Sequence, residues 1–200
     1  MPAPIDFYFD FASPYGYLAS TQVDALAERH GRTVAWRPMM LGAAMKVTGG
    51  RPLPQIPMRG DYMARDVPRF ARLLGVPFAW PQKTPILSLA AARAVYRVAD
   101  DDPELAKRLA RALFHAHFGQ GRDITTPDQV GEVAADLDIA AAALTAALQM
   151  PEIKQRLKDE TNAAVARGVF GSPFFFVDDE PFWGVDRLDQ VERWLETRGF

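Results

Sequence analysis

The chain has 200 residues, with 23 Lys and Arg against 25 Asp and Glu, so its formal net charge is −2. A nucleic-acid surface typically needs a strong positive excess, which this composition lacks. No apolar run approaches the ~20 residues of a membrane-spanning helix, and the first ten residues lack the basic region and unbroken apolar core of a secretory signal. We therefore expect a cytoplasmic protein without nucleic-acid or membrane partners.

The sequence contains no cysteine. Disulfides, thiolate catalysis by the chain itself and cysteine-based metal sites are thereby excluded. His115 and His117 are two residues apart on a predicted helix, so they point to nearly opposite faces and are poorly arranged to share a metal. We expect no metal site, and any thiol that takes part in a reaction must arrive with a ligand.

The first 40 residues predict a β-α-β unit. Residues 4–11 form a short apolar run typical of a buried strand. Ser13 and Pro14 match the N-cap and first position of a helix, which the apolar spacing extends to His30. Residues 33–38 predict the second strand.

The middle of the chain is predicted to be a loop followed by helices. Residues 41–60 are rich in Gly, Pro and Met and predict a long loop, a kind of segment that is often functional. The predicted helices cover residues 61–74, 87–99 and 103–118, a helix starting at the capping box of Thr126 and Gln129, a helix from its cap Asp138 to Leu148, and a helix from Pro151 to about Arg167.

Strands return at the end of the chain. Residues 174–177 and 181–184 predict a hairpin, and residues 187–198 an amphipathic helix. The order β-α-β, helices, β-β-α is that of a thioredoxin-like α/β fold with an inserted all-helical domain. We expect a discontinuous thioredoxin-like domain of residues 1–40 and 168–200, with the loop and helical insertion over 41–167.

Ser13 stands where a thioredoxin-like oxidoreductase would carry its nucleophilic cysteine. The start of a helix presents unpaired N–H groups and the positive end of the dipole, so a thiolate held there has a lowered pKa. Ser13 is either only an N-cap or a hydroxyl that donates to a bound thiolate. No glycines of a nucleophile elbow flank it, which disfavours an attacking serine.

Two further positions could contact a ligand. In this topology the Ser172–Pro173 bond is expected to be cis, leaving the N–H and C=O of Ser172 free to pair with an extended peptide. The alternative is an edge-strand proline without a ligand role. Asp186 precedes the last helix and is an N-cap, a carboxylate facing a ligand ammonium, or both.

Several side chains could contact a substrate. Lys46, Arg51 and Arg59 lie in or beside the Gly- and Pro-rich segment and could bind carboxylates, although solvated loop charges are the simpler interpretation. Tyr15 and the nearby aromatic and methionine side chains either line an apolar pocket or belong to the core.

The chain resembles a known family over essentially its whole length. The segments that carry the resemblance are DFYFDFASPY (6–15), MKVTG (45–49), RGDYMARD (59–66), GVFGSP (168–173) and FWGVDRL (182–188). Together they are similar to the kappa-class glutathione transferase family and, within it, to the bacterial 2-hydroxychromene-2-carboxylate isomerases. The resemblance implies a DsbA-like thioredoxin fold, a homodimer, and glutathione as cofactor.

The resemblance also assigns roles to residues. Ser13 matches the catalytic serine that holds the glutathione sulfur. Ser172 and Pro173 match the cis-proline site that pairs with the cysteinyl unit, and Val185 and Asp186 match the pair that grips the γ-glutamyl end.

Two positions depart from the family pattern. Arg59 stands where a lysine near the glycine carboxylate is usual, and Gly50 falls near an Asn that contacts glutathione or substrate in many members. Tyr15, Lys46 and Arg51 are the residues expected to contact the substrate.

The implied reaction interconverts 2-hydroxychromene-2-carboxylate and trans-o-hydroxybenzylidenepyruvate, small aromatic carboxylates of aromatic degradation. Glutathione thiolate adds to the opened conjugated ketone, the former double bond rotates, and elimination restores the thiol. Two alternatives are a kappa-like transferase that conjugates electrophiles and a non-enzymatic DsbA-like binding module that has lost its cysteines.

Overall fold

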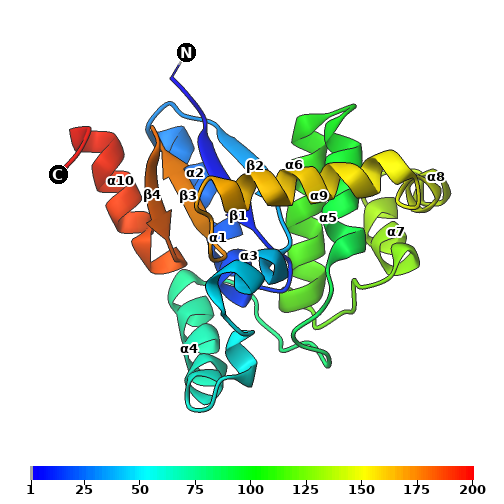
Figure 1. The fold of residues 1–200 in the computed structure, drawn as a ribbon, viewed down its shortest axis with the longest axis horizontal. Helices are drawn as coiled ribbons and strands as arrows, with labels where there is room; N and C mark the ends of the chain where they lie inside the picture. The colour runs from blue at the N-terminus through cyan, green and yellow to red at the C-terminus, as the bar shows by residue number, and fades with distance from the viewer. Residues whose placement is uncertain (1) are drawn as a thin grey trace.

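The computed structural model describes residues 2–200 (Figure 1). Its centre is a four-stranded sheet in the order β2-β1-β3-β4. The strands are β1 (Ile5–Phe9), β2 (Val34–Pro38), β3 (Phe174–Val177) and β4 (Glu180–Trp183). β1 runs parallel to β2 and antiparallel to β3, which pairs antiparallel with β4. The two ends of the chain therefore build one sheet.

Alternate side chains of the strands cover the two faces of this sheet. Phe7 and Phe9 share one core with buried residues of α1 (Pro14–Ser20), α2 (Val23–Arg29) and α10 (Leu188–Thr197). Tyr8 lies on the opposite face, in a second cluster that includes Ala44 of α3 (Leu41–Thr48) and Ala164 of α9 (Pro151–Ala166). This division follows the two-residue period of a strand.

The remaining helices lie to the sides of the sheet. They include the short η1 (Leu53–Gln55), α4 (Arg59–Leu74), α5 (Leu89–Ala99), α6 (Pro103–Phe114), α7 (Pro127–Ala135) and α8 (Ala141–Ala147). In Figure 1, α5 to α8 gather on one side, α4 projects below the sheet, and the long α9 leads back toward β3. No helix within residues 2–200 combines the length and apolar character needed to cross a membrane.

The predicted thioredoxin-like fold with inserted helices is confirmed. The capping box also forms: Thr126 Oγ1 accepts from Gln129 N–H, and Gln129 Oε1 accepts from Thr126 N–H. The Ser172–Pro173 peptide bond is cis, as expected.

The long loop predicted over residues 41–60 is wrong for its first part, which forms α3, and η1 forms within the rest. The N-cap residue of α3, Met40, makes no side-chain cap. Instead, the carboxylate of Asp10 accepts from Leu41 N–H at 2.7 Å. The cap of this helix comes from a residue distant in sequence, so the local composition did not indicate a helix.

Other predicted boundaries also change. The single helix expected up to His30 is two helices, and at the break Thr21 Oγ1 donates to the carbonyl of Leu18 at 2.8 Å. Asp138 is not a cap: its φ is +60°, and α8 starts after Ala140. The helix expected over 103–118 changes at residue 115 into a five-residue π-helical segment.

Candidate functional site

Ser13 is the N-cap of α1, as the sequence predicted. Its backbone is extended, and its Oγ accepts from Gly16 N–H at 3.1 Å. Pro14 occupies the first helical position, where no N–H is needed. The Ser13 residue is buried, with 7% of its surface exposed. Its hydroxyl is thus held at the start of the helix, where the unpaired N–H groups and the dipole favour an anion.

The fold brings Ser172 against Ser13. Ser13 Oγ donates to the carbonyl oxygen of Ser172 at 2.8 Å. A Cβ on Gly16 would lie 3.0 Å from Ser172 Oγ, so glycine permits this close approach. The expectation that the Ser172 carbonyl has no partner is therefore wrong, because it already accepts from Ser13, and only its second lone pair is left for a ligand. Within residues 2–200, the N–H of Ser172 donates to no acceptor.

Asp10 is a site residue that the sequence reasoning missed. It lies at the end of β1, its surface is 4% exposed, and its N–H donates to Ser172 Oγ at 2.9 Å. Its carbonyl accepts from Ser13 N–H at 2.9 Å. An Asp three residues before a helix cap is typical of a turn in which the side chain also accepts a backbone N–H. The three-residue spacing from Asp10 to Ser13 was therefore the sequence signal that could have identified Asp10.

Tyr15 joins α1 to α4 through a carboxylate. Its hydroxyl donates to Asp66 at 2.8 Å, and Asp66 also accepts from Tyr62 and Arg69. Burial, the Asp66 contact and the nearby charge of Asp186 raise the pKa of Tyr15. The phenol therefore remains protonated at neutral pH, and Asp66 and Asp186 lie close enough to act on it.

Val185 and Asp186 lie in a short 3-10 helix, η3 (Val185–Arg187), that packs against α1. Val185 is buried and Asp186 is exposed. Both line a groove that α2, α4 and α10 complete. The alternative role of Asp186 as a helix cap is wrong, because its side chain caps neither η3 nor α10. Its carboxylate contacts only the neighbouring Arg187, at 3.5 Å, among the described side chains.

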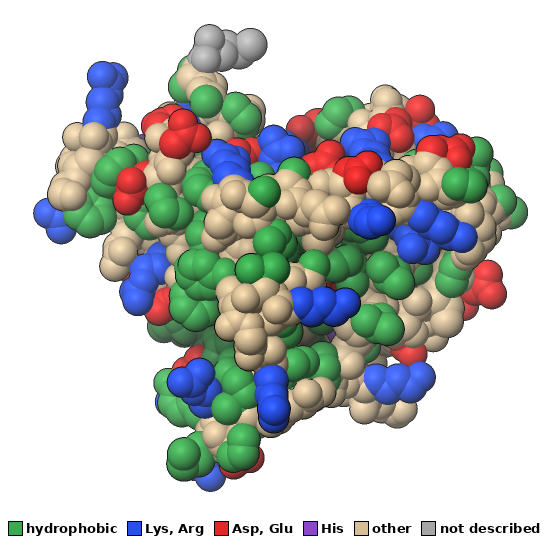
Figure 2. Space-filling view, in the orientation of Figure 1, with side chains coloured by type: hydrophobic (Ala, Val, Ile, Leu, Met, Phe, Trp, Pro, Cys, Tyr) green, Lys and Arg blue, Asp and Glu red, His purple; other side chains and the backbone are tan. Residues whose placement is uncertain are grey.

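The three candidate cations do not contact Ser13. Lys46 lies in the last turn of α3, Arg51 follows that helix, and Arg59 begins α4. All three are exposed, and none forms an ion pair within residues 2–200. Figure 2 shows Lys and Arg side chains around hydrophobic surface over α3 and α4. The first residue of α3 contacts Asp10, which brings this helix to the Ser13 loop.

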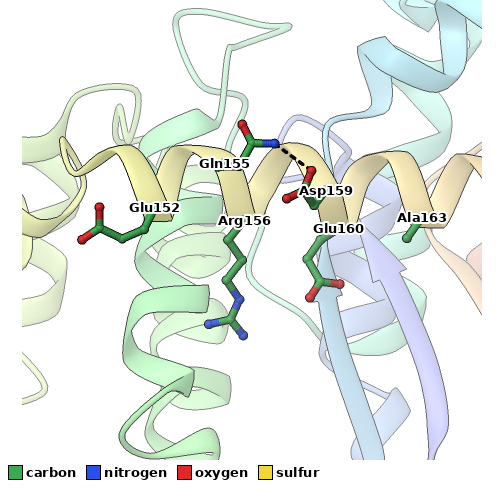
Figure 3. A pocket seen from close by; sticks show the side chains of 6 residues that line it. All are labelled: Glu152, Gln155, Arg156, Asp159, Glu160 and Ala163. Atoms are coloured by element: carbon green, nitrogen blue, oxygen red, sulfur yellow. Dashed lines mark hydrogen bonds between the residues drawn. The ribbon is translucent and has the colours of Figure 1, made fainter.

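A surface hollow elsewhere on the molecule contains none of these residues. It follows one side of α9 and is lined by Glu152, Gln155, Arg156, Asp159, Glu160 and Ala163 (Figure 3). Polar groups of this hollow already pair within the protein: Gln155 donates to Asp159 at 2.8 Å, and Arg156 donates to Asp100 and to the carbonyl of Tyr96. The chemistry of this hollow is that of a solvated helix face, so the candidate site remains at the start of α1.

Comparison with known proteins identifies the family of this chain. The model of the DSBA-like thioredoxin domain matches residues 4–196. The 2-hydroxychromene-2-carboxylate isomerase of Sphingobium xenophagum is 33% identical over 198 residues, covering 98% of this chain and 99% of that protein. The chain belongs to the DsbA-like thioredoxin family.

Two further relatives place this DsbA-like chain within the family. A solved 2-hydroxychromene-2-carboxylate isomerase superposes with a TM-score of 0.88 at 29% identity, covering 96% of this chain and 94% of that one. Human glutathione S-transferase kappa 1 is 26% identical over 212 residues, covering 98% of this chain and 94% of that protein. The DsbA-like chain is therefore an enzyme of the group that contains these isomerases and kappa-class transferases.

Proposed function

We propose that the chain is a glutathione-dependent isomerase that interconverts 2-hydroxychromene-2-carboxylate and trans-o-hydroxybenzylidenepyruvate. The observation that carries the proposal is the pairing of Ser13 with Ser172 at the start of α1, in a chain without cysteine. A thioredoxin-like site of this kind has no thiol of its own. It is suited to a thiol that a ligand brings.

The residues present fit glutathione. The N–H of Ser172 has no acceptor within residues 2–200, and beside a cis-proline it can pair with the main chain of a cysteinyl unit. Ser13 would hold the sulfur, and Pro173 would contact the same unit. Val185 would pack against the γ-glutamyl end while Asp186 accepts from its ammonium. Arg59, which keeps the positive charge usual at its position, would face the glycine carboxylate.

The two serines can exchange hydrogen bonds when a ligand binds. Ser13 has one proton to donate, and without ligand it donates to the Ser172 carbonyl. A cysteinyl N–H that pairs with this carbonyl would compete with the Ser13 hydroxyl and weaken its bond. Ser13 would then be free to donate to the sulfur, while the start of α1 stabilises its negative charge. Correct pairing of the ligand main chain would thereby favour the thiolate.

Bound glutathione would supply the nucleophilic thiolate that adds reversibly to the conjugated ketone and leaves unchanged after the carbon–carbon bond has rotated. On the substrate side, Tyr15 remains protonated but donates its proton to Asp66, so its phenol oxygen and ring would contact the substrate. Lys46 or Arg51 would attract the substrate carboxylate from the rim of the site. Gly50 offers no side-chain amide, so this enzyme would lack the polar contact that an Asn can make there.

We also propose the oligomeric state, the location and the domain boundaries that the sequence led us to expect. The enzyme would act as a homodimer in the cytoplasm, with residues 1–40 and 168–200 forming the thioredoxin-like domain and residues 41–167 the insertion. A conjugating kappa-like transferase needs the same activated thiolate, so it is the second candidate. A binding module without glutathione affinity is the third.

The test is calorimetric titration of the purified protein with reduced glutathione, followed by an isomerase assay that also measures free thiol. We expect saturable binding, weaker binding of S-methyl glutathione, and isomerisation at constant thiol concentration. Consumption of thiol with an electrophile, and no isomerisation, would favour the transferase. Absence of binding at millimolar glutathione would reject both and favour the binding module.

A further inference from the structure

Three helix starts converge on the carboxylate of Asp10. Its Oδ1 accepts from Ala12 N–H at 2.9 Å, just before α1, and from the hydroxyl of Ser88 at 2.7 Å. Its Oδ2 accepts from Leu41 N–H at 2.7 Å, the first residue of α3. Ser88 is the N-cap residue of α5 and is fully buried. The carboxylate thus joins segments that are far apart in sequence.

The main chain of the same residue contacts both serines of the site. The carbonyl of Asp10 accepts from Ser13 N–H, and its N–H donates to Ser172 Oγ, each at 2.9 Å. The Ala12 and Ser13 contacts make Asp10 the first residue of a tight turn that ends at the helix cap. The direction of the Ser13 hydroxyl therefore depends on how firmly Asp10 is held.

A buried carboxylate is costly unless its oxygens are hydrogen-bonded. Burial raises the pKa of Asp10, and the hydrogen bonds from Ala12, Ser88 and Leu41 oppose that rise. The positive ends of the surrounding helices act in the same direction as these bonds. The three hydrogen bonds thus hold the buried side chain of Asp10 in one place, and with it the main chain that contacts the two serines.

We propose that Asp10, held by Ser88, is the positioning residue of the thiol site, setting the orientation of Ser13 and Ser172 toward the bound thiol. This inference rests on the proposed glutathione function. It adds a residue that would touch neither glutathione nor substrate. Its effect reaches the thiol only through the two serines.

The cleanest test is Ser88→Ala, because it removes one bond to Asp10 and leaves the Asp10 side chain itself in place. The readout is the pKa of the thiol of bound reduced glutathione, measured by ultraviolet thiolate absorbance. We expect a rise of about 0.5 to 1 pKa unit, since a loosened Ser13 stabilises the thiolate less. The affinity for S-methyl glutathione should stay within about twofold, because that probe has no thiol.

The matched control is Ser20→Ala. Ser20 is also a buried serine, at 3% exposure, and its hydroxyl donates to the carbonyl of Tyr17 at 2.6 Å. The control loses a comparable buried bond without touching Asp10. We expect its bound thiol to keep the wild-type pKa.

A second variant, Asp10→Asn, separates the positioning effect of Asp10 on the serines from the effect of its negative charge on the thiol. Removing a negative charge near the thiolate would by itself lower the thiol pKa. Loss of positioning would raise the thiol pKa. The amide N–H of the introduced asparagine would face a backbone N–H that now donates to the carboxylate, so one of these bonds would be lost. We expect the pKa of the bound thiol to be higher in Asp10→Asn than in the wild type, when both are measured at equal fractions of folded protein.

An unchanged thiol pKa in Ser88→Ala, or a lowered one in Asp10→Asn, would overturn the positioning role. If the wild-type protein still lowers the pKa of the glutathione thiol, either of these results would leave the proposed function intact. A wild-type protein that does not bind glutathione would reject the proposed function and this inference together.

Discussion

The hydroxyl of Ser13 donates to the carbonyl oxygen of Ser172 at 2.8 Å, although 159 residues separate the two serines. The contact joins the start of the first helix to the strand hairpin near the end of the chain. It also uses the single proton that Ser13 has to donate. Under the proposed function, a bound thiolate would have to compete for that proton, so the contact is tested by mutation of Ser13.

Ser13→Ala should separate the chemical role of Ser13 from its role as a cap. Loss of an N-cap hydroxyl lowers the free energy of unfolding by about 1 kcal/mol. If Ser13 also stabilises the thiolate, turnover should fall about 10- to 100-fold and the pKa of the bound thiol should rise. Turnover at saturating glutathione and ultraviolet titration measure the two effects.

Thr126→Ala is the control for that variant, since Thr126 also caps a helix with its side chain but lies outside the candidate site. It should lose a similar free energy of unfolding and keep full turnover. Equal turnover in both variants would reduce Ser13 to a cap.

Asp186→Asn should weaken glutathione binding. The carboxylate is exposed and caps no helix, so its loss should hardly change the free energy of unfolding. An ionic hydrogen bond to an ammonium should be worth about a tenfold change in the glutathione Kd. Calorimetry of Asp186→Asn against Asp136→Asn, an exposed carboxylate at the end of α7, measures the difference. The same Kd in both variants would argue that Asp186 does not contact the ligand.

Tyr15→Phe should weaken the contact between α1 and α4. Tyr15 donates to the carboxylate of Asp66 from a half-buried position, so we expect a loss of about 1–2 kcal/mol in the free energy of unfolding. Tyr62 donates to the same carboxylate from an exposed position, and Tyr62→Phe should cost less than about 0.5 kcal/mol. Urea unfolding at neutral pH compares the two variants.

The loss in Tyr15→Phe should depend on pH. Burial raises the pKa of Asp66, but the bonds from Arg69, Tyr15 and Tyr62 outweigh it and leave the pKa below the ordinary value. The stability from the ionised carboxylate is present above the ordinary aspartate pKa and is lost as the pH falls through the lowered one. The difference between wild type and Tyr15→Phe should narrow in that acid range. A difference that stays constant would mean that the bond does not need the charge.

Lys46→Gln and Arg51→Gln should raise the KM for an aromatic carboxylate substrate by about threefold each at low salt, with little change in kcat. Both cations are exposed, so added salt should reduce the effect. Lys158→Gln makes the same change of charge on the exposed face of α9 and should leave KM unchanged. An equal rise of KM in all three variants would mean that the net charge of the protein, and not the position of Lys46 or Arg51, determines substrate binding.

Much of the fold could be predicted from local patterns. The apolar run of β1, Pro14 at the first helical position and the capping box of Thr126 each have a mechanism that acts within a few residues. Such signals predicted the order of elements and hence the thioredoxin-like topology. Ser13 and Ser172 could be identified as candidates because they stand at the junctions of those elements, and the missing cysteine means that any thiol in a reaction must come with a ligand.

The rest depended on contacts between distant segments. α3 is capped by Asp10 across 31 residues, so its own composition predicted a loop. The occupied carbonyl of Ser172 followed from a hydroxyl 159 residues away, and the support of Asp10 by Ser88 spans 78 residues. Sequence alone determined the order of the elements and the candidate site residues Ser13 and Ser172, because local patterns act within a few residues. Only the tertiary structure decided which of their donors and acceptors are already in use, because hydrogen-bond partners are chosen by proximity in space.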